Sequence, residues 1–169
     1  MARRLSLVIL LALVVLLVYG PAQAKGKERL KSEVQALLDQ AAAGFMKRDI
    51  KAVLAISASD CLIQYRNGRT LPIAQWARGI GEEIAQWQSV KSVFVVKKAW
   101  RMAAAQAGAA YTERHEFTTA KDPGHKHAIA ARFEAVLHKT EQGWRVRKFI
   151  EKSVKFYRDG KEIRPKAKQ

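Results

Sequence analysis

Two stretches near the end of the chain alternate apolar and polar residues, with a short polar segment between them. Odd positions from Ile129 to Leu137 are apolar, whereas even positions include the charged residues Arg132 and Glu134. Successive side chains of a strand point to opposite faces, so the pattern predicts a strand with one buried side. Gly143 ends a polar turn, after which a second alternating run begins. The two runs therefore predict a β-hairpin.

The register of this hairpin follows from the two apolar sets. Folding the chain about Glu141 and Gln142 brings the apolar positions of both runs to one face and opposite charges to the other. The predicted cross-strand pairs are Leu137 with Val146, Phe133 with Ile150, and Arg132 with Glu151. The second strand is expected to bury Trp144, Val146, Ile150 and Val154.

Earlier in the chain, apolar residues recur at helical spacing. A first amphipathic helix is predicted to end near Lys47, with an apolar stripe made of Leu30, Val34, Leu37, Leu38, Ala41, Phe45 and Met46. Asp49 is placed to cap a second, shorter helix. Thr70 is placed to cap a third helix, whose apolar stripe includes Trp76.

Strands are predicted between and after these helices. Residues 57–60 are expected to separate the second helix from a short strand, Cys61–Arg66, which Asn67-Gly68 ends as a turn. From residue 91 the period becomes two, which predicts strands over 92–102 and 107–119 before the hairpin. Helices that pack on one face of a mostly antiparallel sheet make an α+β domain.

The two ends of the chain predict segments outside this domain. Residues 1–24 have a basic start, an apolar run and a small-residue cleavage site, which is typical of a signal peptide. An uncleaved anchor stays open as the alternative. We therefore expect a domain at 25–157, exported to the periplasm or secreted, followed by a basic tail at 158–169 that frays.

Charge affects the expected partners. The chain has 31 Lys and Arg against 15 Asp and Glu, a net charge of +16. Anionic envelope surfaces would attract it weakly. No nucleic-acid-binding motif accompanies the charge, so we expect no specific nucleic-acid partner. The single cysteine, Cys61, cannot form an internal disulfide and is predicted to be a buried apolar residue.

The order of elements and several short sequences resemble the nuclear transport factor 2-like superfamily and, within it, the SnoaL-like group. The resemblance covers about Leu30 to Ser153 and is carried by Ala41-Ala42-Ala43-Gly44-Phe45, Asp49, Ser59-Asp60-Cys61, Arg132–Leu137 and Gly143-Trp144-Arg145-Val146. It implies a cystatin-like α+β roll, in which a cone-shaped, curved sheet wraps three N-terminal helices around an apolar pocket. It also implies a dimer formed through the sheet.

The resemblance implies a fold more strongly than an activity. Its members include isomerases, cyclases and dehydratases, and a fold alone does not assign a reaction. Several relatives place His residues on the last strand after the Trp, where this chain has Lys148 and Ile150. The five Asp residues lie at helix ends, turns or the tail, where capping explains them.

Strand pairing nevertheless brings candidate site residues together. Placing Phe117 opposite Ile129 puts Tyr111, Glu113 and His115 on the buried face, whereas the alternative register would bury their charged neighbours at a higher desolvation cost. In this register His115 faces Ala131, Glu113 faces Phe133 and Tyr111 faces Ala135.

Lys148 is expected to reach the same face from the last strand. In a catalytic interpretation Glu113 is a general base, and His115 or Tyr111 steadies the developing oxyanion. In a structural interpretation, which we favour, Glu113 and Lys148 form a satisfied pair and His115 is hydrogen-bonded in the core.

Three functional hypotheses result. The first is an exported domain that binds a small apolar or amphipathic ligand through Tyr111, Lys148, Trp76 and Phe133, without established catalysis. The second is an isomerase- or cyclase-like enzyme with Glu113 and His115 as catalytic residues. The third is a basic interaction module for anionic polymers or lipids. We expect no cofactor and no metal, and we interpret His125-Lys126-His127 as a solvated loop.

Overall fold

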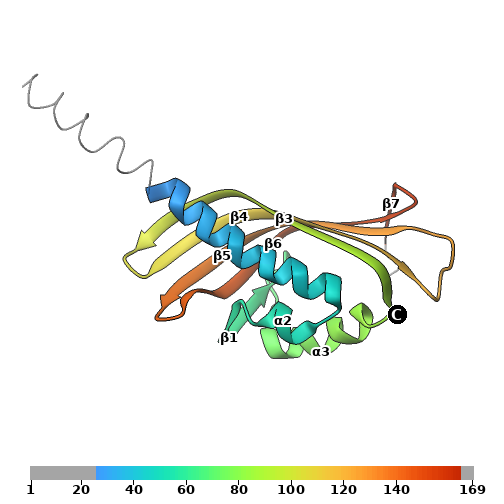
Figure 1. Ribbon diagram of the computed structural model, residues 1–169, viewed down its shortest axis with the longest axis horizontal. Helices are drawn as coiled ribbons and strands as arrows, with labels where there is room; N and C mark the ends of the chain where they lie inside the picture. Colours follow the sequence, from blue (N-terminus) through green and yellow to red (C-terminus); the bar gives the residue numbers. More distant parts are fainter. Residues whose placement is uncertain (1–25, 165–169) are drawn as a thin grey trace, which may run out of the picture.

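The computed structural model describes residues 26–164, which form three helices and one curved sheet (Figure 1). The first helix occupies residues 26–47, and it is followed by α2 (Ile50–Leu54) and α3 (Ile73–Ile84). The strands are β1 (Ser57–Gln64), β2 (Thr70–Pro72), β3 (Trp87–Ala103), β4 (Gln106–Thr119), β5 (His127–Thr140), β6 (Gly143–Arg158) and β7 (Lys161–Ile163).

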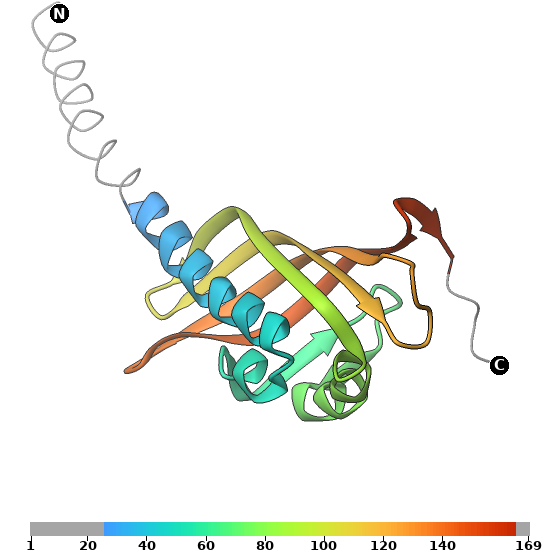
Figure 2. The same cartoon turned by 45° about the vertical axis from the view of Figure 1, so that its right-hand side comes forward.

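The sheet has the strand order β2-β1-β6-β5-β4-β3, and β7 pairs with the end of β6. The pairing of β1 with β6 is parallel, and every other pairing is antiparallel. The first helix crosses the concave face, while α2 and α3 lie together near β1 (Figure 2). The predicted α+β class, with three N-terminal helices on a mostly antiparallel sheet, is confirmed. The predicted signal peptide lies outside the described residues.

The first helix packs along its predicted apolar stripe. Its buried residues are Leu30, Val34, Leu37, Leu38, Ala41, Ala42 and Phe45. Met46, which the spacing assigns to the same stripe, is instead 46% exposed, although its neighbour Phe45 is buried. At Gly44 the helix approaches α2 so closely that an added Cβ would lie 2.8 Å from the backbone nitrogen of Val53. This contact explains a glycine inside a helix, where alanine would otherwise be favoured.

Local signals in the sequence succeeded at some element ends and failed at others. Asp49 caps α2 as predicted, because its side chain accepts hydrogen bonds from two backbone N–H groups of the first turn. Asn67 and Gly68 form the predicted turn, with Gly68 at a φ of +85°. Thr70 is not a helix cap, since it lies in β2 and α3 begins only after Pro72. Residues 57–60 do not form the predicted separate connection between α2 and the strand, but are the first residues of β1.

Residues 161–163 are more ordered than the sequence suggests. Residues 161–163 form β7 and pair with residues 156–158 of β6, which corrects the expected fraying of this part of the tail. Within residues 26–164, no helix combines the length and the apolar character needed to cross a membrane.

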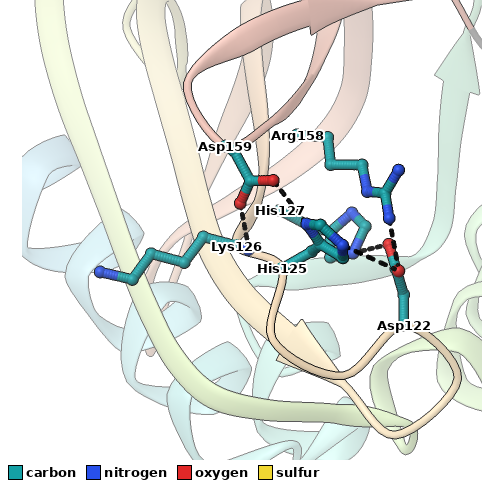
Figure 3. A network of polar contacts seen from close by, with 6 residues as sticks. All are labelled: Asp122, His125, Lys126, His127, Arg158 and Asp159. Atoms are coloured by element: carbon teal, nitrogen blue, oxygen red, sulfur yellow. Dashed lines mark hydrogen bonds and ion pairs between the residues drawn. The ribbon is translucent and has the colours of Figure 1, made fainter.

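A polar network joins the turn between β4 and β5 to the turn between β6 and β7 (Figure 3). Its members are Asp122, His125, Lys126, His127, Arg158 and Asp159. The Asp159 carboxylate accepts a hydrogen bond from the Lys126 backbone N–H at 2.9 Å and lies 2.6 Å from His125 Nδ1. The Arg158 guanidinium donates to Asp122 at 2.7 Å. The segment that we interpreted as a solvated loop therefore holds two turns together.

Candidate functional site

A cavity of about 250 Å³ lies between the helices and the concave face of the sheet. Aromatic side chains supply much of its wall: Phe45, Tyr65, Trp76, Trp87, Phe94, Tyr111, Phe133, Phe149 and Phe156. Aliphatic residues from the first helix, α2, α3 and β1 complete it, among them Leu38, Val53, Ile63 and Ile73. A concave, mainly apolar space with a few polar groups is the usual form of a small-molecule site.

Alternation along β4 delivers three polar side chains to this cavity. Tyr111, Glu113 and His115 all line it, as the sequence predicted from their odd positions. The pairing that carried this prediction is nevertheless wrong by two residues. Glu113 lies opposite Ala131, and Phe117 lies opposite His127. Phe117 and its partner are two residues closer along the chain than predicted, so the turn is shorter, and an error of two residues preserves the face on which each side chain lies.

His115 is held firmly in the wall of the cavity. Its side chain is 4% exposed, its Nδ1 lies 2.9 Å from Ser92 Oγ, and its Nε2 lies 3.6 Å from Glu113 Oε1. The Phe45 ring packs on the imidazole with centroids 4.4 Å apart. A carboxylate can only accept a hydrogen bond, so an imidazole proton on Nε2 suits Glu113, and the Ser92 hydroxyl can donate to Nδ1. The imidazole Nε2 thus faces the Glu113 carboxylate.

Tyr111 is almost completely buried, at 3% exposure, and its ring stacks on Phe133 with centroids 5.7 Å apart. Burial raises the pKa of the phenol well above its ordinary value, and the nearby Glu113 carboxylate adds to this rise. The hydroxyl therefore stays protonated. Among the hydrogen bonds of residues 26–164, none involves the Tyr111 hydroxyl, so this buried group is free to bind a ligand.

The last strand brings a different residue to the cavity from the one we predicted. Lys148 lies opposite Val136 on the outer face and is not part of the lining. Glu151, which we had placed on the outer face opposite Arg132, instead lies opposite Phe133 and lines the cavity. The structural interpretation in which Glu113 pairs with Lys148 is therefore wrong.

Two irregularities in β6 cause this exchange. Leu137 lies opposite Val146 as predicted, but Arg147 and Lys152 have no partner on β5, and each shifts the register by one residue. A bulge that adds one residue reverses which side chains face inward and bends the strand. The inner face of β6 accordingly consists of Trp144, Val146, Phe149, Glu151, Val154 and Phe156.

Helix α3 supplies part of the cavity lining. Trp76 is half-buried and lines the cavity, as predicted, and Phe133 does the same from β5. Glu83, one turn after Ile80 on the same helix, is exposed and adds a carboxylate at the edge of the site. Of the predicted site residues, Tyr111, Glu113, His115, Trp76 and Phe133 are brought together, and Lys148 is not.

No protein-family model and no curated protein sequence matches this chain. Solved structures do match it. A scytalone dehydratase-like protein from Novosphingobium aromaticivorans has a TM-score of 0.65 at 8% identity, over 79% of this chain and 88% of that one. A ketosteroid isomerase-like protein from Erwinia carotovora atroseptica has a TM-score of 0.55 at 17% identity, over 73% and 96%. An NTF-2-like protein from Shewanella oneidensis has a TM-score of 0.55 at 12% identity, over 71% and 96%.

These matches define the class of the fold, an α+β roll with a cavity between helices and curved sheet. The chain has the fold of the nuclear transport factor 2-like superfamily, and the predicted resemblance is confirmed at the level of the fold. At identities between 8% and 17% the matches assign no activity.

Proposed function

We propose that this chain is a small-molecule-binding domain whose ligand occupies the cavity between the helices and the concave face. The observation that supports it is an aromatic-lined space of about 250 Å³ with polar groups in one wall. Protein cavities of about 150 Å³ hold benzene, so this one suits a compact ligand of one or two fused rings. Its wall is mainly apolar, so most of the ligand is apolar as well.

Binding of 2-naphthalenemethanol, a neutral bicyclic probe, tests this proposal. Ligand-observed NMR should detect the probe on the wild-type protein. Ile129→Trp, which adds a large ring to the lining, should weaken binding at least about tenfold, because the ring occupies ligand space. Leu62→Trp is the matched control, since Leu62 is 39% exposed, and it should bind as the wild type does. Equal binding by both variants would place the probe outside the cavity and overturn the proposal.

The Glu113–His115–Ser92 arrangement favours a second candidate function, proton transfer at carbon. Glu113 would act as a general base, oriented by His115, and the protonated Tyr111 hydroxyl would donate to a developing oxyanion. Two of the solved structures are named for a dehydratase and for a ketosteroid isomerase. Loss of a proton from carbon is a step that both kinds of reaction share.

Hydrogen exchange of 2-tetralone in D2O tests this candidate. The wild-type protein should accelerate exchange of the protons next to the carbonyl, and Glu113→Gln should lower that acceleration about 100-fold or more. Glu141→Gln, a change in an exposed turn, serves as the control and should keep the full rate. A wild-type rate equal to that of buffer, or a Glu113→Gln rate equal to that of the wild type, would exclude catalysis of this type.

A further inference from the structure

The charges of the cavity are opposite in sign to those of the molecule as a whole. The chain carries a net charge of +16, with 31 Lys and Arg residues. Among the described residues that line the cavity, none is Lys or Arg, and the acidic ones are Glu83, Glu113 and Glu151. The cavity therefore offers carboxylates and aromatic rings to a ligand but no cationic side chain to an anion.

We propose that the cavity selects a compact aromatic or alicyclic ligand with a primary ammonium group, which Glu151 and the Tyr111 hydroxyl bind. This inference rests on the proposed binding function and names the chemical class of its ligand.

Glu151 is placed to receive such a group. It is half-buried in the cavity wall, and its carboxylate has no hydrogen bond or ion pair with any described residue. Taking a charge partly out of water is costly unless the charge is paired, so this half-buried carboxylate would gain from a counter-charge. Glu113, by contrast, already has the His115 imidazole at 3.6 Å.

Tyr111 supplies an independent reason to expect a polar ligand group in the same place. Glu151 on β6, Phe133 on β5 and Tyr111 on β4 lie side by side across three neighbouring strands. The Tyr111 side chain is 3% exposed and lines the cavity, and its hydroxyl makes no hydrogen bond with any described residue, so it is available to a polar group of a ligand. An ammonium has three N–H donors, which can serve a carboxylate and a hydroxyl oxygen together.

The aromatic wall completes the recognition of a cation. Phe133 stacks on Tyr111, and the rings of Phe149 and Trp76 lie in the same lining. The faces of aromatic rings attract cations, and the attraction increases when the cation is removed from water. The apolar part of the ligand would contact the remaining rings, and its ammonium would lie at the wall that contains Glu151.

Three naphthalene probes of similar shape test the inference: 2-naphthylmethylamine, which is cationic at pH 7, neutral 2-naphthalenemethanol, and anionic 2-naphthoate. Titration at constant ionic strength should show the amine binding roughly 10- to 100-fold tighter than the alcohol, because a charge-assisted hydrogen bond replaces a neutral one. The carboxylate should bind most weakly. The net positive charge of the protein works against this order, so a preference for the amine must come from the cavity.

Two isosteric Glu→Gln variants test whether Glu151 causes the preference for the amine. Glu151→Gln should weaken binding of the amine about tenfold and leave binding of the alcohol within about twofold, because only the charge is removed. Glu134→Gln removes a carboxylate that pairs with Lys152 on the outer face, and it should change neither affinity. Thermal unfolding of both variants would confirm that each is folded.

Each other outcome has a definite meaning. If the alcohol binds as tightly as the amine, or the naphthoate binds tightest, the ammonium inference is overturned while the binding function stands. If Glu151→Gln leaves the amine affinity unchanged, the assignment to Glu151 is wrong. If none of the three probes binds, the proposed binding function itself fails.

Discussion

The outer face of the sheet carries many charged residues, and many of these pair with one another. The inner face carries few charged residues, and these are poorly paired. Outside, carboxylates pair with nearby cations. Glu116 pairs with Arg114 of the same strand, and pairs between neighbouring strands join Glu134 with Lys152, Glu162 with Lys155, and Asp60 with Arg147. Inside, Glu113 has only His115 nearby, and Glu151 has no partner among the described residues. Exposed pairs contribute little to stability and mainly keep the surface soluble.

This difference separates two reasons for which a protein carries charge. Charges on the outer face lie in water and are satisfied by one another, so their exact positions matter little. Charges on the inner face cost free energy of folding, and Glu151 gains no pairing contact from the described residues in return. Residues of the second kind are the ones to examine for function, since active sites depart from the rules that favour stability.

The largest expected effect comes from removing an inner aromatic ring. Trp87 is 2% exposed and stacks on Phe117 with centroids 4.1 Å apart. Trp87→Ala should lower the free energy of unfolding by about 3–5 kcal/mol, through lost burial and the space left behind. On the outer face Val93 is 44% exposed, and Val93→Ala should change that free energy by less than about 0.5 kcal/mol. Urea unfolding measures both, and similar losses would contradict the assignment of the two faces.

Two adjacent positions of β1 allow the inner and outer faces to be compared through the reactivity of a thiol. Cys61 is 1% exposed, and burial raises the pKa of its thiol to about 12. Its neighbour Leu62 points outward and is 39% exposed. At pH 8 about 10⁻⁴ of such a buried thiol is ionised, against roughly 0.2 of an ordinary one, so alkylation should be about 10³-fold slower.

The measurement compares the wild type with the double variant Cys61→Ala, Leu62→Cys, each treated with iodoacetamide and followed by mass spectrometry. Equal rates would mean that β1 does not present alternate residues to the two faces, and the assignment of inside and outside on this strand would be wrong.

The sequence predicted the fold well because the relevant signals are local and repeated. Alternation over β4 identified Tyr111, Glu113 and His115 as inward-facing even though the assumed pairing was wrong by two residues. A shift of two residues leaves every side chain on its face, whereas a shift of one exchanges the faces. Helical spacing likewise placed nearly the whole apolar stripe of the first helix.

The sequence failed at β6 for the converse reason. Arg147 and Lys152, the two residues of β6 that have no register partner on β5, are ordinary exposed residues, and nothing in their identity indicates a bulge. The first shift exchanged Lys148 for Glu151 at the site, and the second restored the original phase before Val154. A hint was present, because uninterrupted alternation would have buried a lysine. The bulges bend β6, and this bend is required because the whole sheet curves around the helices. Such a requirement is not visible in the local sequence.

A smaller effect is expected at the free edge of the sheet. β3 ends the strand order, and Gln35 of the first helix occupies its open edge by donating to Phe94 O at 2.9 Å and accepting from Val96 N at 2.8 Å. Gln35→Leu should lower the free energy of unfolding by about 1–3 kcal/mol, because two backbone groups lose their partner. It should also increase association between chains, since unpaired strand edges pair with other molecules.

Gln40→Leu is the matched control for this edge, because Gln40 is an exposed residue of the same helix. Urea unfolding and size-exclusion chromatography would measure the two effects. A variant at Gln35 that is as stable and as monodisperse as the one at Gln40 would show that the edge needs no cover.

The smallest expected effect concerns the paired carboxylates, through the network in Figure 3. The Lys126 backbone N–H, together with His125, lowers the pKa of Asp159 below its ordinary 3.8. Desolvation raises the pKa of Asp122, but the hydrogen bond and charge of Arg158 outweigh it, so that pKa is lowered as well. A lowered carboxyl pKa stabilises the fold at neutral pH, and this contribution is lost as the pH falls through the folded-state value.

Asp159→Asn isolates this contribution, because asparagine also tolerates the φ of +51° at this position. The variant should be slightly less stable than the wild type at pH 7, and the difference should shrink as the pH falls below about 4, where the wild-type carboxylate becomes protonated. Urea unfolding across this pH range measures it, with Glu141→Gln as the control whose difference from wild type stays constant. A gap between Asp159→Asn and wild type that widens in acid would have the wrong sign for a carboxylate stabilised by its neighbours. In that case the outer charges would be as poorly satisfied as the inner ones, and pairing could not distinguish structural from functional carboxylates in this fold.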